Sequence, residues 1–292
     1  MGFGEAASRF AKDFSQAGLS SIFAYSPSLA QAESHDPLQM RAAEAGVIPV
    51  PTPKALCERS TLIIALTPGS AALAALRRLR PHLRPDHIYV DATTASVKAM
   101  EQAAKLLAGR GAFVDAAIMD PVPMHGIKVL TVASGSHAGE FQALLAPYGM
   151  NIQVIGGKPG AASAMKLMRS VCMKGLAAVL LESLEAAQRY GIVDALVADM
   201  SRFIDGQPFE QVIKRFVCGT AIHAPRRIPE MTEALALLKS LDASTRMTRA
   251  TRGMISEVAD MGLRERFGAR EPDRITPVLE AIVEIKGRKA ER

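Results

Sequence analysis

The sequence lacks the features of a membrane-spanning or disulfide-bonded protein. No apolar run reaches the roughly 18 residues of a membrane span, and the first residues do not combine a charged region with an apolar stretch. Three cysteines, Cys57, Cys172 and Cys218, share no short spacing with one another, and no CxxC motif or Cys/His pairing appears. Such a pattern indicates neither a disulfide framework nor a metal site. We therefore expect a cytoplasmic protein with reduced cysteines, no bound metal and no membrane association.

Aromatic residues are also scarce, at 5% of the 292 residues. None is interleaved with the two densest basic segments, residues 77–84 and 286–292. Because bases stack on aromatic side chains in many nucleic-acid sites, the net charge of +6 does not predict nucleic-acid binding. It favours instead an anionic cofactor or an acidic small-molecule substrate. With 49% hydrophobic residues, a chain of this length can form two globular domains.

Short apolar segments and helix-like segments alternate through the first half of the chain. The patterns predict strands at residues 20–25, 47–50, 61–66, 88–91, 112–119, 128–133 and 151–155, and helices at residues 38–45, 53–57, 70–79, 98–107 and 141–145. Such alternation builds a parallel sheet with helices on both faces. The strand signals stop near Gly157, so we predict an α/β domain of the Rossmann type over residues 1–157.

The second half of the chain carries helical patterns only. We predict helices at residues 160–191, 193–203, 208–217, 229–241, 243–261 and 275–285. These segments predict an all-helical domain over residues 158–292, with no internal repeat and no low-complexity segment.

A glycine motif, GFGEAA, occupies residues 2–7. Two glycines let the backbone turn tightly beside a pyrophosphate, whose charge rests on the following helix N-terminus. Cofactor contacts are expected from Gly2, Phe3, Gly4, Glu5 and Ala6. The motif normally follows a strand, but this sequence starts inside it, so we expect the first strand to be missing. The alternative is that the motif is accidental.

Three further loops follow predicted strands, at the edge where parallel sheets bind ligands. Their candidate cofactor residues are Ser26, Leu66, Thr67, Pro68, Thr93 and Thr94. Ser26 stands about 20 residues after the glycines, where a carboxylate would bind the ribose of NAD. The lack of a carboxylate favours NADP slightly over NAD. The alternative for all three loops is that Ser, Thr, Pro and Gly stand there only because turns favour these residues.

The long helix predicted at residues 160–191 carries one polar stripe. Lys166, Arg169, Ser170 and Lys174 follow at steps of three, four and eight residues and share a helix face. A lysine held against apolar surroundings is pushed towards its neutral form, which can exchange a proton near neutral pH. Lys166 is therefore a candidate acid/base. The alternative is a lysine whose amine reaches solvent past a packed stem.

Five segments in this order resemble the β-hydroxyacid dehydrogenases, a family that includes 6-phosphogluconate and 3-hydroxyisobutyrate dehydrogenases. GFGEAA resembles the opening glycine motif, and AAEAGVIPVPTPKALCERSTLIIALTPGS resembles a second motif ending in a Leu-x-Pro loop. DATTAS resembles an Asp-x-Ser-Thr strand end, and VDAAIMDPVP a substrate loop. GAASAMKLMRS resembles the catalytic helix, which implies that Lys166 is the catalytic residue.

The sequence also departs from the family. Ser170 stands where the catalytic helix has an asparagine, Arg169 where it has asparagine or histidine, and Met119-Asp120-Pro121 where the substrate loop has Ser-Gly-Gly. These departures are similar to a branch with its own phosphogluconate-dehydrogenase-like helical domain and an unsettled substrate. The candidate substrate-binding residues are Met119, Asp120, Arg169, Ser170, Lys174, His223 and Arg227.

The resemblance implies an NAD(P)-dependent oxidoreductase acting on a small hydroxy acid or a sugar-acid-like alcohol. It also implies a homodimer formed through the helical domain. An imine reductase is a second enzymatic reading, although such enzymes often replace this lysine by another proton donor. A dinucleotide-binding sensor or dimeric scaffold without catalysis is the rival from a different class.

Overall fold

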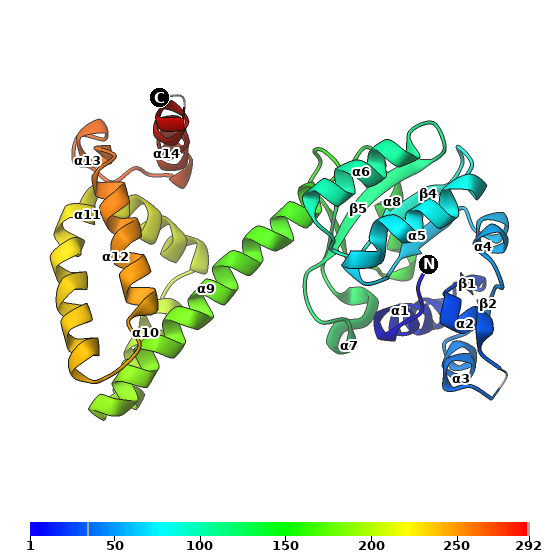
Figure 1. The fold of residues 1–292 in the computed structure, drawn as a ribbon, viewed down its shortest axis with the longest axis horizontal. Coiled ribbons are helices and arrows are strands. Elements are labelled where there is room, and N and C mark those ends of the chain that lie inside the picture. The colour runs from blue at the N-terminus through cyan, green and yellow to red at the C-terminus, as the bar shows by residue number, and fades with distance from the viewer. Residues whose placement is uncertain (34, 291–292) are drawn as a thin grey trace. The chain divides into compact units, whose positions relative to one another are not determined.

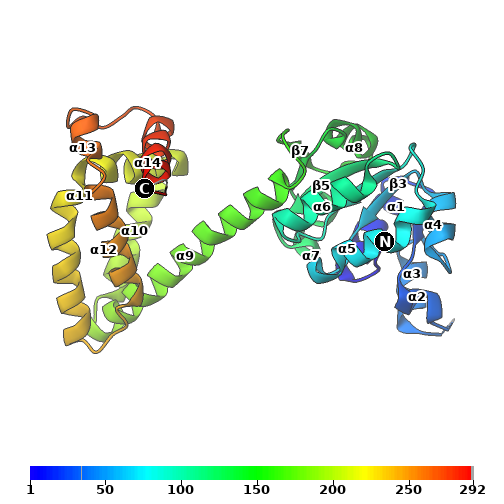
Figure 2. The same ribbon diagram turned by 45° about the horizontal axis from the view of Figure 1, so that its top comes forward.

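The computed structural model describes residues 1–33 and 35–290, which form two compact units that divide between Val171 and Cys172. The first unit contains every strand found in these residues, and the second contains only helices (Figure 1, Figure 2). This organisation agrees with the predicted fold class. The units divide inside helix α9 (Ala161–Tyr190), whereas the change from mixed to helical patterns falls near residue 157.

A five-stranded sheet in the order β3-β4-β5-β6-β7 lies at the centre of the first unit, and β1 and β2 form a separate pair. The strands are β1 (Ile22–Ala24), β2 (Val47–Pro49), β3 (Leu62–Ala65), β4 (Ile88–Asp91), β5 (Ala112–Ile118), β6 (Thr131–Ser134) and β7 (Ile152–Val154). All the pairs are parallel except β5 with β6.

The antiparallel β6 is an exception to the predicted parallel arrangement. The segment between β5 and β6 carries only the helix α7 (Val122–His125) and the 3-10 turn Gly126–Lys128. A parallel connection usually needs a longer crossover helix, so this short segment leads back in the opposite direction. The strand predicted at residues 128–133 starts later than expected, at Thr131.

Helices cover both faces of the sheet, as the alternation of side chains along the strands requires. In β4, Ile88 and Val90 pack on one face with Phe10 of α1 (Glu5–Gln16) and Phe141 of α8 (Ala138–Leu145). Tyr89 points to the other face, among residues of α5 (Ala72–Leu79) and α6 (Val97–Leu107). The remaining helices of this unit are α2 (Pro27–Gln31), which was not predicted, α3 (Pro37–Glu44) and α4 (Pro53–Arg59).

One long helix of the second unit was predicted as two shorter helices. Residues 208–217 and 229–241 were predicted as separate helices, but they belong to α11 (Phe209–Ser240), which contains Pro225 and Pro229. A proline removes one backbone hydrogen bond and normally kinks or breaks a helix. Here Ala221, Ile222 and Ala224 are buried around the first proline, and packing can override weak local propensity.

The other helices of the second unit are α10 (Val193–Asp205), α12 (Arg246–Ala259), α13 (Leu263–Arg266) and α14 (Ile275–Ala290). In both views α11 and α12 lie side by side (Figure 1, Figure 2). Cys218 and Ala221 of α11 pack with Leu263 of α13 and Val278 of α14 in one apolar cluster. None of the helices among residues 1–33 and 35–290 combines the length and apolar character needed to cross a membrane.

Glu182 of α9 caps the start of α12. Its side chain is only 6% exposed, and it accepts hydrogen bonds from Ser244 Oγ, Met247 N, Thr248 N and Thr248 Oγ1. Burial alone would raise the pKa of this carboxyl, but the four hydrogen bonds outweigh burial and lower it to about 2 from 4.5. The ionised form of Glu182 therefore stabilises the fold.

Replacing Glu182 by glutamine is expected to lower the free energy of unfolding at pH 7 by about 2 kcal/mol, because an amide is a weaker acceptor than a carboxylate. The folded pKa lies below the unfolded one, so this contribution is complete above about pH 4.5 and is lost as the pH falls towards 2. Urea unfolding of both proteins between pH 7 and pH 3 measures the difference. If the difference in unfolding free energy between the two proteins stayed constant over this range, the lowered pKa of Glu182 would be contradicted.

Candidate functional site

The glycine motif forms a tight turn that leads into α1. Gly2 has a φ of +88°, and a Cβ at this position would lie 2.8 Å from the carbonyl oxygen of Leu66. Gly4 is the N-cap of α1 and provides no side-chain cap, and a Cβ on it would meet no atom within 4 Å. The N-terminus of α1 therefore faces open space, and this is the arrangement that a pyrophosphate requires.

A pocket of about 270 Å³ lies where β3, β4 and β5 end. It is lined by Ala6, Leu66, Thr67, Ala92, Thr93, Thr94, Ile118, Asp120, Val122 and Lys166. The carboxyl edge of parallel strands is the usual ligand-binding edge of such sheets. Seven of the predicted site residues thus meet in one pocket, namely Ala6, Leu66, Thr67, Thr93, Thr94, Asp120 and Lys166.

Lys166 of α9 reaches this pocket and donates a hydrogen bond from Nζ to Thr94 Oγ1 at 3.0 Å. Thr94 has a φ of 56°, a conformation that a β-branched residue rarely adopts. Such backbone outliers cluster at functional sites, where the surrounding structure holds them in place. The partner of the candidate acid/base is therefore itself held in an unusual position.

Buried polar groups of the sheet fix the first turn of α9. The Asp115 carboxylate of β5 accepts hydrogen bonds from Ser163 N at 3.0 Å and Ser163 Oγ at 2.6 Å. Ser134 of β6 donates to the same carboxylate at 3.1 Å and accepts from Ala162 N at 3.0 Å. These contacts satisfy free amides at the helix start, and Lys166 follows within one turn.

Asp91 organises the neighbouring loop. Its Oδ1 accepts hydrogen bonds from Thr93 N at 3.0 Å and Thr93 Oγ1 at 2.6 Å. Burial raises the pKa of the Asp91 carboxyl, and the bonds from Thr93 oppose that rise. Thr67 Oγ1, on the adjoining loop, is buried with no hydrogen-bond partner within the described part of the chain. A buried hydroxyl of this kind calls for an explanation, and a bound polar ligand is one.

Arg169 holds the loop that follows β5. Its guanidinium donates to Met119 O and, at 3.0 Å, to Asp120 Oδ1. Arg169 and Asp120 remain about two-fifths exposed, so this ion pair is open to competition from a substrate acid group. Ser170, the next residue of α9, is half-buried.

Other predicted site residues of the first unit do not line the strand-end pocket. Phe3 packs in a core cluster with Ala24 and Leu29, Glu5 lies exposed in the first turn of α1, and Ser26 caps α2 by accepting from Leu29 N. Pro68 precedes the 3-10 turn Gly69–Ala71.

The remaining three candidates belong to the second unit. Lys174 is exposed. His223 Nε2 donates to Glu271 Oε1 at 3.1 Å, and Arg227 Nη1 donates to Thr220 Oγ1. His223 and Arg227 lie inside α11 and not at a helix start.

Asp91, Asp115 and Ser163 were not among the predicted site residues, although they support the residues that were. The two carboxylates lie within fully buried strands. A carboxylate in an otherwise apolar strand almost always has a buried partner, and this signal could have found both.

Comparisons with known proteins agree with this architecture. Residues 187–258 match the model of a domain of unknown function, DUF1932. A conserved hypothetical protein from Sinorhizobium meliloti is 31% identical, with a TM-score of 0.63, over 87% of this chain and 85% of its own. A conserved protein of unknown function, reported to be structurally similar to 3-hydroxyacid dehydrogenases, is 32% identical, with a TM-score of 0.60, over 90% of this chain and 96% of its own.

The chain belongs to the 6-phosphogluconate dehydrogenase-like family of NAD(P)-binding proteins. The same fold occurs in the imine reductase from Myxococcus stipitatus. A variant in complex with NAD+ has a TM-score of 0.74 at 19% identity, over 95% of this chain and 97% of the reductase. The enzyme in complex with NADP+ has a TM-score of 0.66 at 20% identity, over 89% and 93%. In this family member, the strand-end pocket and the Lys166–Thr94 pair lie together in the first unit.

Proposed function

We propose that this protein is an NAD(P)-dependent oxidoreductase that transfers a hydride between a small hydroxy acid, or a sugar-acid-like alcohol, and a nicotinamide. Lys166 is the general acid and base. The observation that carries this proposal is the position of the Lys166 amine in one pocket with the strand-end residues Leu66, Thr67, Thr93 and Thr94. The family relation supports the same class of reaction.

The residues of the first unit fit a nicotinamide dinucleotide. The uncapped N-terminus of α1 and the open space beside Gly4 suit a pyrophosphate. The buried Thr67 hydroxyl suits a polar group of the cofactor. No carboxylate occupies the turn after β1, where Ser26 stands, and this favours NADP over NAD. When bound, the dinucleotide supplies the hydride acceptor or donor.

The chain's own residues take up the substrate's hydroxyl proton and bind the substrate's acid group. In oxidation the Lys166 amine takes the proton of the substrate hydroxyl while the carbinol carbon loses a hydride. Thr94 orients the amine by accepting its hydrogen bond. Arg169 and Ser170 lie one turn further along α9 and are placed to bind the acid group of the substrate.

An imine reductase is the second candidate, because imine reductases share this fold. The two activities make different demands on Lys166. A hydroxyl substrate needs a group that takes up its proton, and the Lys166 amine in the pocket provides one. A dinucleotide sensor without turnover is the candidate from another class.

Nicotinamide fluorescence during titration with NADPH and NADH tests the proposal, followed by turnover assays with hydroxy acids, sugar acids and cyclic imines. We expect binding of NADPH and oxidation of at least one hydroxy acid. Turnover of imines alone would favour the reductase. Binding without any turnover would favour the sensor, and the absence of binding would overturn the cofactor assignment.

Replacing Gly4 by aspartate is expected to weaken NADPH binding by about 100-fold, because a carboxylate would face the pyrophosphate. The fold should tolerate it, since Gly4 has a φ of −100° and aspartate is a good N-cap. Gly139→Asp is the matched control, since it adds a carboxylate to open space in the first turn of α8. Fluorescence titration measures affinity and thermal unfolding measures stability. Equal affinities for the two variants would count against a pyrophosphate at α1.

We also propose that the protein forms a homodimer through its helical unit. This unit exposes large apolar side chains, including Leu181 at 74%, Tyr190 at 61%, Met254 at 59% and Val283 at 71%. Exposed apolar surface of this kind usually marks an interface. We expect light scattering to give twice the chain mass of 31.1 kDa. Leu181→Glu should give the monomer, and Lys239→Glu, on the exposed end of α11, should not.

A further inference from the structure

The segment between β5 and β6, residues 119–130, is tied to α1 by two residues of that helix. Arg9 donates from Nε to the two carboxylate oxygens of Asp13, at 2.9 and 3.1 Å, and from Nη1 to Pro123 O at 2.9 Å. Asp13 Oδ2 also accepts from Ile127 N at 3.0 Å. Arg9 and Asp13 therefore hold both α7 and the 3-10 turn that follows it.

The segment is shaped to receive the Asp13 carboxylate. Gly126 has a φ of +55°, and a Cβ on it would lie 1.7 Å from Asp13 Oδ2. Glycine adopts this backbone conformation readily, and because it has no side chain the carboxylate can fill the place beside it. The Asp13 side chain is only 17% exposed, so this contact is largely shielded from water. It needs an aspartate on α1 and a glycine on the segment.

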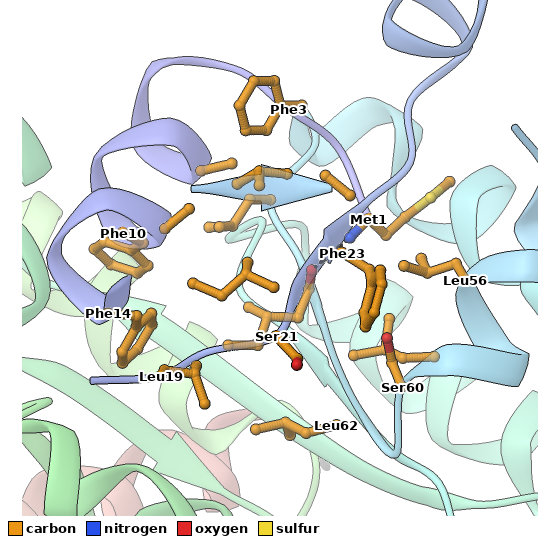
Figure 3. A pocket seen from close by; sticks show the side chains of 18 of the residues that line it. Met1, Phe3, Phe10, Phe14, Leu19, Ser21, Phe23, Leu56, Ser60 and Leu62 are labelled. Carbon is orange, nitrogen blue, oxygen red and sulfur yellow. Dashed lines mark hydrogen bonds between the residues drawn. The ribbon is translucent and has the colours of Figure 1, made fainter. Parts of the chain in front are cut away.

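Apolar side chains of α1 strengthen the same contact. Phe10 and Phe14 line an apolar cavity beside the sheet (Figure 3) and belong to the same core cluster as Val122 of α7. Each phenylalanine directly follows a member of the Arg9–Asp13 pair, so the polar and apolar contacts recur together on successive turns of the helix. They join α1 to the segment over two turns.

Both of the joined elements reach the strand-end pocket. Ala6 of α1 and Asp120 and Val122 of the segment line this pocket together with Lys166. The N-terminus of α1 is also the place proposed above for the pyrophosphate. One end of α1 thus meets the cofactor, and further along its length the helix holds the segment that lies beside the substrate.

We propose that Arg9 and Asp13 are positioning residues that transmit binding of the dinucleotide at α1 to Asp120 and Val122 in the strand-end pocket. This inference rests on the function proposed above. The bound cofactor restrains α1, and the two side chains pass that restraint to the segment. The substrate then meets a segment that is already ordered, so cofactor and substrate each raise the affinity of the protein for the other.

Hydrogen exchange with a cofactor fragment tests this coupling in the full chain. The probe is ADP-ribose or its 2′-phosphate, whichever matches the dinucleotide that binds more tightly. It carries the pyrophosphate but lacks the nicotinamide, which would touch the pocket directly. We expect the probe to slow amide exchange in peptides covering residues 119–130 by about 10-fold, which is within the usual range of coupling between sites.

In Asp13→Ala the same probe should slow exchange in the segment by less than about twofold, because the link to α1 is lost. Alanine is a good helix former, so α1 should persist, and calorimetry should give a Kd for the probe within about threefold of that of the unchanged protein. Asp199→Ala is the matched control, because it removes an aspartate that pairs with Arg202 inside α10. It should keep the full 10-fold slowing, or about that much.

A second pair of variants covers the case in which Asp13→Ala does not fold. Gly126→Ala places a Cβ against the Asp13 carboxylate, whereas Gly149→Ala adds one at a φ of +80° where no atom lies within 4 Å. The probe should slow exchange in the segment in the second variant and not in the first. If only the whole dinucleotide binds, it replaces the probe in the same comparison of variants.

Equal slowing in Asp13→Ala and in the unchanged protein would overturn the proposal, because the effect would then reach the segment by direct contact or by another route. Binding that leaves exchange in the segment unchanged would also overturn it, and would leave the proposed function intact. If neither NADPH nor NADH bound, the proposed function would be overturned and this coupling with it.

Discussion

Replacing Lys166 by methionine is expected to lower kcat for the hydroxy acid by about 10²–10⁴-fold, the usual contribution of a positioned general acid or base. Methionine keeps an unbranched apolar stem of similar length, so packing along α9 should change little. The amine and its hydrogen bond to Thr94 are lost. Steady-state kinetics give kcat, and nicotinamide fluorescence gives Kd for NADPH, which should stay within about twofold.

The control for this variant is Lys105→Met, an exposed lysine of α6. It removes the same charge from the same unit outside the strand-end pocket, so it should leave kcat and Kd unchanged. If Lys166→Met retained near-normal turnover with unchanged cofactor affinity, Lys166 would not be the acid/base. If it lost cofactor binding as well, its main role would be to shape the cofactor pocket and not to move a proton.

The elements that carry this prediction could be found from the sequence because their signals are local. Short apolar runs located β4 at residues 88–91 and the core of β5, and glycine and proline marked the ends of α9. Once the strands are known to be parallel, their loops must meet at one edge. For this reason Leu66, Thr67, Thr93 and Thr94 could be placed in one pocket before the fold was seen.

Other features depend on contacts between distant segments. The antiparallel direction of β6 follows from the short connection between β5 and β6, and the apolar pattern within the strand itself does not encode it. The continuity of α11 through Pro225 and Pro229 depends on burial of its apolar face against α13 and α14. The cap that Asp115 gives to Ser163 joins residues 48 positions apart. Local propensity is a weak guide in such cases, because packing decides.

The second large effect is expected at this cap. Asp115→Ala should lower the free energy of unfolding by about 3 kcal/mol, because it leaves the Ser163 amide and hydroxyl without their acceptor in a buried place. The carboxylate also lies at the N-terminus of the 30-residue α9, where a negative charge is favoured. Urea unfolding at pH 7 measures the change in free energy.

The same substitution tests whether the cap positions the candidate acid/base. Lys166 lies one turn after Ser163, so loosening the first turn of α9 should reduce kcat at a temperature where the variant is still folded, with little change in Kd for NADPH. Ser134→Ala is the graded control, since it removes the bonds to Asp115 and Ala162 but keeps those to Ser163. It should cost about 1–2 kcal/mol and affect kcat less. An Asp115→Ala protein of unchanged stability would show that the cap does not stabilise the fold. A destabilised variant with normal kcat would show that the cap does not position Lys166. In either case Thr94 would remain as the residue that orients the amine.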